Sequence, residues 1–244
     1  MFTTDALVLS HTNYRDYDRM LTLYSPTLGR LDAVAQGCQR PKSPLMNATE
    51  RFCAGEFSLV EARGRLTLRD CRIKESFYPL RQDVDRLTAG AYLLHLLLQC
   101  AQPEEANRPL FLTSLKALAY FAYGGLPLSM AVMGYELHYL ALTGQAPRMD
   151  ACCVCGRPFV QQPGLFSVHL GGVLCPGCGV GEPLSHGARR ILMRVPMTPF
   201  TALEKLPGHP DWPEAARHAR SFVAYRLDSP PRLWPGIEEG SRLG

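Results

Sequence analysis

The chain has 244 residues, of which 46% are hydrophobic and 20% are charged, and its formal net charge is +4. This balance excludes a disordered protein and allows one large core or two to three small ones. The start MFTTDALVLSHTNYRD lacks the pattern of a secretion signal, and the most apolar run, residues 89–100, is too short and too polar to cross a membrane. With nine cysteines, an odd number, we expect a cytoplasmic protein without disulfides or membrane contact.

The first 80 residues carry the alternation and turn signals of β-strands. The expected strands span residues 6–10, 18–25, 29–37, 55–62 and 65–73. Between the third and fourth lies the proline-containing basic loop QRPKSPLMNATERF. Five strands in about 75 residues, joined by short Gly and Pro turns, are typical of an OB-fold β-barrel.

Helical patterns follow on both sides of a cysteine-rich stretch. Residues 81–144 predict three strongly apolar helices, the first capped by Asp83, and residues 184–228 predict two more that are basic on one side. Residues 145–183 hold the cysteines, and residues 229–244, rich in Pro and Gly, predict a loose tail. The fold class is therefore α+β and multi-domain: residues 1–80 an OB-fold barrel, residues 81–144 with 184–228 an α-helical bundle domain, and residues 145–183 a C4 zinc-finger module.

The cysteine pattern is the strongest local motif. Cys152-x-x-Cys155 and Cys175-x-x-Cys178 match the template for one tetrahedral Zn²⁺, in which backbone amides donate to the sulfurs. Gly156 and Gly179 follow the two pairs, where we expect positive φ. The stretch LFSVHLGGVL predicts a hairpin that returns the second pair to the first. Four thiolates close the shell, so we expect a structural ion and no metal-assisted hydrolysis.

Other interpretations of the cysteines fit less well. A redox CxxC normally stands alone beside a βαβ unit, and paired knuckles around a hairpin favour zinc over an iron–sulfur centre. Cys153 is assigned outside the shell, and His169 is expected to be exposed on the hairpin. The scattered thiols are expected to be small hydrophobic residues: Cys38, Cys53, Cys71 and Cys100.

Charge is segregated along the chain. Residues 62–74 hold five bases against one acid and residues 186–226 hold seven against three, whereas residues 82–150 hold four bases against six acids. Such segregation indicates a polyanion-binding face, although scattered solvated charge fits comparably well. The sequence has no phosphate-binding glycine loop, dinucleotide fingerprint, HExxH or GxSxG motif, and its DxD pairs at Asp16/Asp18 and Asp83/Asp85 fit structural roles. We therefore expect no enzyme.

Two runs resemble the bacterial recombination mediator family RecO. In ALVLSHTNYRDYDRMLTLYSPTLGRLDAVAQGCQRPKS, the matching positions are Tyr14, Asp18, Thr22, Leu23, Tyr24, Gly29, Gly37, Arg40, Lys42 and Ser43. The later run FAYGGLPLSMAVMGYELHYLALTGQAPRMDACCVCGR, followed by FSVHLGG and CPGC, resembles the family's helical segment and cysteine module. The resemblance covers about residues 1–195, with Asp16 standing where the family has Glu.

The resemblance implies a non-enzymatic mediator of DNA repair. Such a protein binds single- and double-stranded DNA, anneals complementary strands, and works with RecR to load recombinase onto DNA coated by the single-strand-binding protein SSB. It is nucleoid-associated and can hold the SSB C-terminal tail. The DNA-binding candidates are Arg15, Arg19, Arg40, Lys42, Arg63, Arg65, Arg69, Arg72, Lys74, Arg189, Arg190 and Arg194. The rival functions are a zinc-braced OB-fold adaptor for proteins and a zinc-dependent hydrolase or nuclease.

Overall fold

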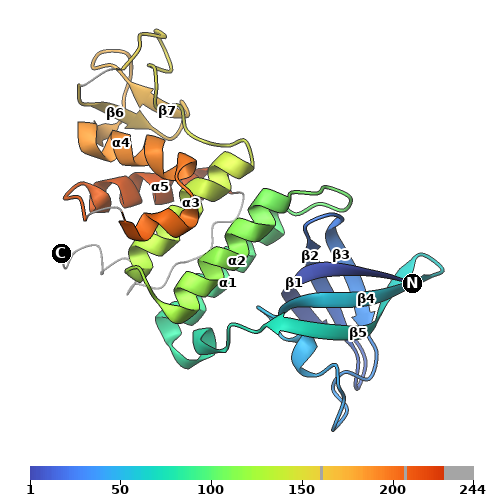
Figure 1. The fold of residues 1–244 in the computed structure, drawn as a ribbon. Helices are drawn as coiled ribbons and strands as arrows, with labels where there is room; N and C mark the ends of the chain where they lie inside the picture. Colours follow the sequence, from blue (N-terminus) through green and yellow to red (C-terminus); the bar gives the residue numbers. More distant parts are fainter. Residues whose placement is uncertain (160–161, 206–207, 228–244) are drawn as a thin grey trace. The chain divides into compact units, whose positions relative to one another are not determined.

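A computed structural model describes residues 1–159, 162–205 and 208–227 of the chain (Figure 1). Contacts divide it into two units, Met1–Ala122 and Tyr123–Gly244. The division falls inside the helical region, so the expected domain limits at residues 80, 144 and 183 stay predictions. The expected loose tail, residues 229–244, lies outside the described residues.

The first unit opens with a closed five-stranded barrel, as predicted. Its strands follow the order β1-β2-β3-β5-β4 around the barrel. They are β1 (Phe2–Asn13), β2 (Arg19–Ser25), β3 (Gly29–Ala35), β4 (Ala54–Ala62) and β5 (Arg65–Glu75). β1 pairs with both β2 and β4, and β3 pairs in parallel with β5 through Ala33–Leu66 and Val34–Thr67. Closure leaves the barrel without an open sheet edge.

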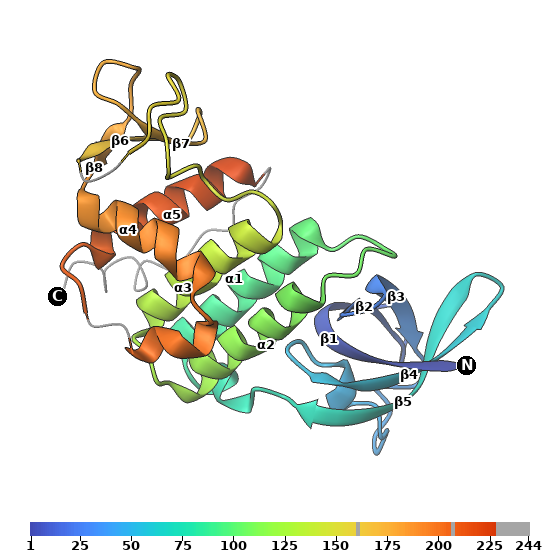
Figure 2. The same cartoon turned by 45° about the horizontal axis from the view of Figure 1, so that its top comes forward.

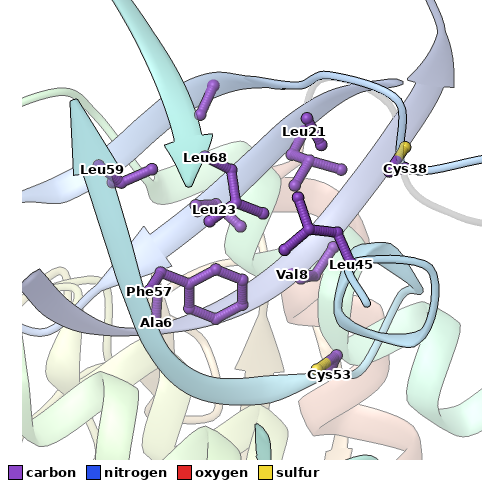
Figure 3. Close-up of a cluster of buried hydrophobic side chains, with 12 residues drawn as sticks. Ala6, Val8, Leu21, Leu23, Cys38, Leu45, Cys53, Phe57, Leu59 and Leu68 are labelled. Carbon is purple, nitrogen blue, oxygen red and sulfur yellow. The ribbon is translucent and has the colours of Figure 1, made fainter. Parts of the chain in front are cut away.

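Alternating side chains fill the barrel interior. Leu21 and Leu23 on β2 point inward, while Thr22 between them reaches Asp32 on the outer face with a 2.8 Å hydrogen bond. Figure 3 shows the cluster around Phe57. Its buried members are Ala6, Val8, Leu21, Leu23, Ala33, Ala35, Cys38, Leu45, Cys53, Phe57, Leu59 and Leu68. The period of two in the sequence therefore fixes which residues face the core.

Two helices complete the first unit. A 3-10 turn (Tyr78–Gln82) leads into α1 (Val84–Cys100), and α2 runs over Arg108–Tyr123. The Asp83 side chain accepts from the Arg86 backbone amide and caps α1, as predicted. Arg86 then donates to the carbonyls of Phe121 and Ala122 at the end of α2. On the barrel side, Tyr24 of β2 packs 6.1 Å from Phe111 of α2, measured between ring centroids.

The second unit surrounds one buried helix. Residues 131–140 of α3 (Leu128–Leu142) are all buried, and α5 (Trp212–Arg226) packs against this helix. α4 (His186–Arg194) packs on α5, and 3-10 turns at Val195–Met197 and Phe200–Lys205 lie beside α3. A small sheet in the order β7-β6-β8 is formed by Gly172–Leu174, Gly164–Ser167 and Glu182–Leu184. In the described ranges, no helix is long and apolar enough to cross a bilayer.

Candidate metal centre and nucleic-acid interface

The four cysteines predicted as ligands lie together. The sulfurs of Cys152, Cys155, Cys175 and Cys178 are all within 4.8 Å of one another. The Cys155 and Cys175 sulfurs are 3.8 Å apart. A tetrahedral ion with metal–sulfur bonds of about 2.3 Å requires sulfurs about 3.8 Å apart, so this set fits such an ion. In the part of the chain that the structure describes, it is the one group of three or more His, Cys, Asp or Glu side chains that could hold a metal.

The β6–β7 hairpin brings the two pairs together. β6 and β7 are antiparallel, with Leu165 opposite Leu174, and their turn contains Gly171 at φ 81°. The backbone amide of Cys153 donates to the Val173 carbonyl at 2.9 Å, which ties the first knuckle to β7. The predicted hairpin at Gly171-Gly172 is thereby confirmed, and it converts a separation of 19 residues into contact.

The thiols differ in their readiness to ionise. Backbone amides of Cys155 and Cys175 donate to the Cys152 sulfur and lower the pKa of that thiol to about 6. Burial raises the pKa of Cys175 to about 12, and the hydrogen bond with Cys155 raises that of Cys178. Adjacent thiolates repel one another, so a bound cation is needed to hold all four ionised at neutral pH.

The glycines after the two cysteine pairs both have positive φ, as predicted. The value is 71° for Gly156 and 159° for Gly179, and the second is close to extended backbone. Within the second pair, Cys175–Cys178, Gly177 adopts the left-handed backbone conformation, at φ 88°. The reason is local: in Cys-Pro-Gly-Cys, proline fixes its own φ at a negative value, and the following glycine makes the reversal before the second cysteine. His169 is exposed, with its ring edge-on to Tyr225.

Arg189 requires a correction. We predicted that it contacts DNA, but its side chain is buried, at 3% exposure. Its guanidinium donates to the carbonyls of Met149 (2.8 Å) and Phe159 (3.3 Å) and lies over the Phe159 ring. Burial also lowers the pKa of this guanidinium. Arg189 therefore anchors α4 to the cysteine module (residues 145–183), and a phosphate cannot reach it.

The two neighbouring arginines of α4 face outward. Arg190 and Arg194 are exposed and line a cavity of about 220 Å³ with Ile191, Val195 and Trp212. Gly187 and His209 complete its lining. Sequence reasoning missed this cavity. The sequence did indicate the basic side of it, because side chains four residues apart on a helix lie on one face. The cavity combines an apolar wall with positive charge.

On the barrel, one basic group lies on two joined loops, residues 14–18 and 36–43, which we call the double loop. Asp18 joins them: its carboxylate accepts from the Gly37 amide at 2.7 Å, and its carbonyl accepts from the Gln39 side chain at 3.2 Å. The double loop carries Arg15, Arg40 and Lys42, all exposed or half-buried. Three of the predicted DNA-binding residues are thus brought together on one loop pair.

Arg19 stands beside the double loop but is otherwise engaged. It donates to the Thr49 hydroxyl at 3.0 Å and pairs with Glu50 at 2.7 Å, and its side chain is only 16% exposed. Its charge is therefore already compensated in the structure. Arg19 thereby braces the loop before β4. Arg51, exposed in the same loop, was missing from the predicted set.

The second basic group lies on the β4–β5 hairpin and along β5. Figure 2 shows this hairpin extending beyond the other strands of the barrel. Arg63 stands at its tip with φ 53°, and Arg65, Arg69 and Arg72 follow along β5, all exposed. Lys74 pairs with Asp5 at 2.6 Å. The β1–β2 and β4–β5 loops are those by which OB-folds bind oligonucleotides, and here both carry arginine.

The DxD pairs serve the backbone. Asp18 accepts from Gly37, and Asp83 caps α1, so one acid of each pair has a structural partner. These contacts agree with the structural roles expected for both pairs.

Comparison with known proteins agrees with this architecture. The family model "Recombination protein O N terminal" matches residues 1–77, and "Recombination protein O C terminal" matches residues 81–235. The chain is 32% identical to the DNA repair protein RecO of Desulforamulus reducens over 93% of this chain and 90% of the relative. It is 36% identical to the DNA repair protein RecO of Symbiobacterium thermophilum over 80% of this chain and 79% of the relative. The chain therefore belongs to the recombination protein O family of DNA repair proteins.

Proposed function

We propose that this protein is a non-enzymatic recombination mediator that binds single- and double-stranded DNA through its barrel and anneals complementary strands. It works with RecR to load recombinase on SSB-coated DNA, in the cytoplasm at the nucleoid. One observation carries the proposal: both OB-fold loops that bind oligonucleotides carry an exposed arginine, Arg15 and Arg63, in a member of a DNA repair family.

The mechanism requires charge and open access but no reacting group. Arg15, Arg40 and Lys42 on the double loop, and Arg63 and Arg65 on the β4–β5 hairpin, neutralise phosphates so that two strands can approach. Contacts of this kind bind without regard to sequence and leave the base edges free to pair. Arg190 and Arg194 provide further phosphate contacts on the second unit.

Zinc is the ion that best fits the cysteine cluster. Four thiolates at tetrahedral spacing are the donors that zinc prefers in structural sites, and they leave no position for water. The ion would brace the cysteine module on α4 and supply no catalysis. Residues 145–183 are accordingly proposed as a zinc-finger module.

The cavity beside α4 suits the SSB tail. A chain end with acidic and apolar residues matches its lining, since Arg190 and Arg194 supply positive charge and Ile191, Val195 and Trp212 supply apolar surface. Arg190→Ala together with Arg194→Ala should weaken binding of a synthetic SSB tail peptide at least ten-fold. Unchanged affinity would place the tail elsewhere.

One annealing experiment separates the three functions. Purified protein is mixed with complementary labelled oligonucleotides, with and without Mg²⁺. Annealing without cleavage supports the mediator. Absence of DNA binding supports a zinc-braced adaptor, and metal-dependent cleavage supports a nuclease.

The charge requirement has a matched control. Arg40→Ala with Lys42→Ala should reduce the slope of log affinity against log salt by about 1.4 for single strands and about 1.8 for duplex, because each contact contributes about 0.7 or 0.9. Lys116→Ala removes an exposed charge from α2, which is part of neither the double loop nor the β4–β5 hairpin, and should leave the slope unchanged. Equal effects of the two changes would refute a DNA site on the double loop.

A further inference from the structure

We infer that Tyr14 and Tyr17 form a stacking platform for unpaired bases, which makes the double loop selective for single strands. The inference rests on the proposed DNA-binding function and goes beyond it, because phosphate contacts alone do not favour a single strand over a duplex. It assigns base contacts to two specific side chains.

The two tyrosines differ in exposure from two other aromatic residues of the first unit. Tyr14 is 40% exposed and Tyr17 is 49% exposed, whereas Tyr24 and Phe52 are each 1% exposed. Tyr24 packs on Phe111, and Phe52 lies under Arg81. Tyr24 and Phe52 thus serve the core, while Tyr14 and Tyr17 keep a large part of their surface open to solvent.

Each exposed ring has an arginine beside it. The Arg15 guanidinium lies 5.2 Å from the Tyr14 ring centroid, and the Arg40 guanidinium lies 5.7 Å from the Tyr17 ring centroid. A planar cation and an aromatic ring held together can both stack on a base, and the cation also attracts the adjacent phosphate. Two such pairs on one loop pair match the chemistry of consecutive nucleotides.

Backbone hydrogen bonds fix the platform before any ligand arrives. The Tyr14 amide donates to the Asp18 carbonyl at 3.0 Å, and the Gln39 amide donates to the Tyr17 carbonyl at 3.0 Å. The Asp18 carboxylate adds its bond to Gly37. These hydrogen bonds restrain the double loop in the free protein, which lowers the entropy cost of binding.

Selectivity follows from where the bases are. In a duplex each base is already stacked on its neighbours and cannot turn out onto a tyrosine without breaking pairs. In a single strand the base faces are open, and stacking on an aromatic ring is independent of sequence because every base has a π-face. The platform therefore adds affinity for single strands only.

The test compares four proteins on three probes. The proteins are the wild type, Tyr14→Leu with Tyr17→Leu, Tyr14→Phe with Tyr17→Phe, and the Lys116→Ala control. The probes are a labelled thymidine oligonucleotide, an abasic strand with the same number of phosphates, and a duplex of the same length. The abasic strand keeps the charge and lacks the bases.

We expect the leucine variant to bind the thymidine strand at least five-fold more weakly, from about 1–3 kcal/mol per stacked base. Its affinity for the abasic strand and the duplex should be unchanged, and the phenylalanine variant should match the wild type. Equal loss on all three probes, or no loss on any, overturns the platform. A wild-type protein that binds none of the probes overturns both the proposed function and this inference.

Discussion

The barrel and the cysteine module reach stable structure by opposite routes. The barrel closes five strands of 7 to 12 residues around a continuous apolar interior. The module and its small sheet have strands of only four, three and three residues, and few buried apolar side chains accompany the four clustered cysteines, among them Phe166, Val173 and Leu174. A hydrophobic core stabilises a chain by itself, whereas a short hairpin with a thiol cluster depends on an ion. The two regions should therefore respond differently to removal of a metal ligand and to disruption of the hydrophobic core.

Loss of the metal should produce the largest effect. Cys175→Ser removes a buried ligand, and we expect loss of the bound ion and unfolding of the module, because structural zinc contributes about 10 kcal/mol or more in small domains. Elemental analysis and thermal denaturation measure the two effects, and DNA binding by the barrel should persist in part. Cys153→Ser, next to a ligand but outside the cluster, is the control and should retain the metal.

Disruption of the barrel should leave the metal in place. Phe57 is fully buried in the barrel, so Phe57→Ala should cost about 3–5 kcal/mol in unfolding free energy and reduce DNA binding. Metal content should stay at the wild-type value. The control is Tyr78→Ala, which removes an aromatic ring that is 60% exposed. Loss of the metal in Phe57→Ala would show that the two regions are one cooperative unit.

Loss of the Arg189 anchor between α4 and the cysteine module should have an intermediate effect on stability. Arg189→Met removes the donor to the Met149 and Phe159 carbonyls, which should lower the unfolding free energy of the second unit by about 1–3 kcal/mol. Urea denaturation followed by tryptophan fluorescence measures the change. Arg190→Met, one residue further along α4 and exposed, should have no measurable effect on stability. Equal midpoints for the two variants would contradict the anchoring role.

Acid should weaken the second unit through His218. Burial is the main cause that lowers the pKa of His218 below 6.5, and the positive charge of Arg217 lowers it further. The hydrogen bond to the Pro183 carbonyl and the charges of Glu182 and Glu214 raise the pKa, but by less. The unfolded chain then binds the proton more readily, so stability should fall as pH drops below about 6.5 and level off below the folded pKa. His218→Gln should flatten this part of the urea midpoint against pH. His169→Gln, at an exposed position, should leave the wild-type curve intact.

Local patterns in the sequence predicted local structure well. The strand alternation, the Asp83 cap and the hairpin at Gly171 each depend on a few neighbouring residues, and the structure confirms them. Arg189 could not be predicted in this way, because its burial depends on carbonyls about 30 and 40 residues away. The ion pair of Arg19 could not be predicted for the same reason, since Glu50 comes beside it only when the barrel closes. Charge in a sequence indicates a surface, but tertiary partners decide whether the charge is available.

The pairing of β1 with β4 and of β3 with β5 has a consequence for folding during synthesis. Both contacts join segments tens of residues apart, so the barrel cannot close until β5 has left the ribosome, and loop closure makes this a slow step. No later strand is required, because β5 ends at Glu75. The barrel can thus be complete well before Cys152 is translated, so the proposed nucleic-acid-binding surface can fold before the proposed metal site exists.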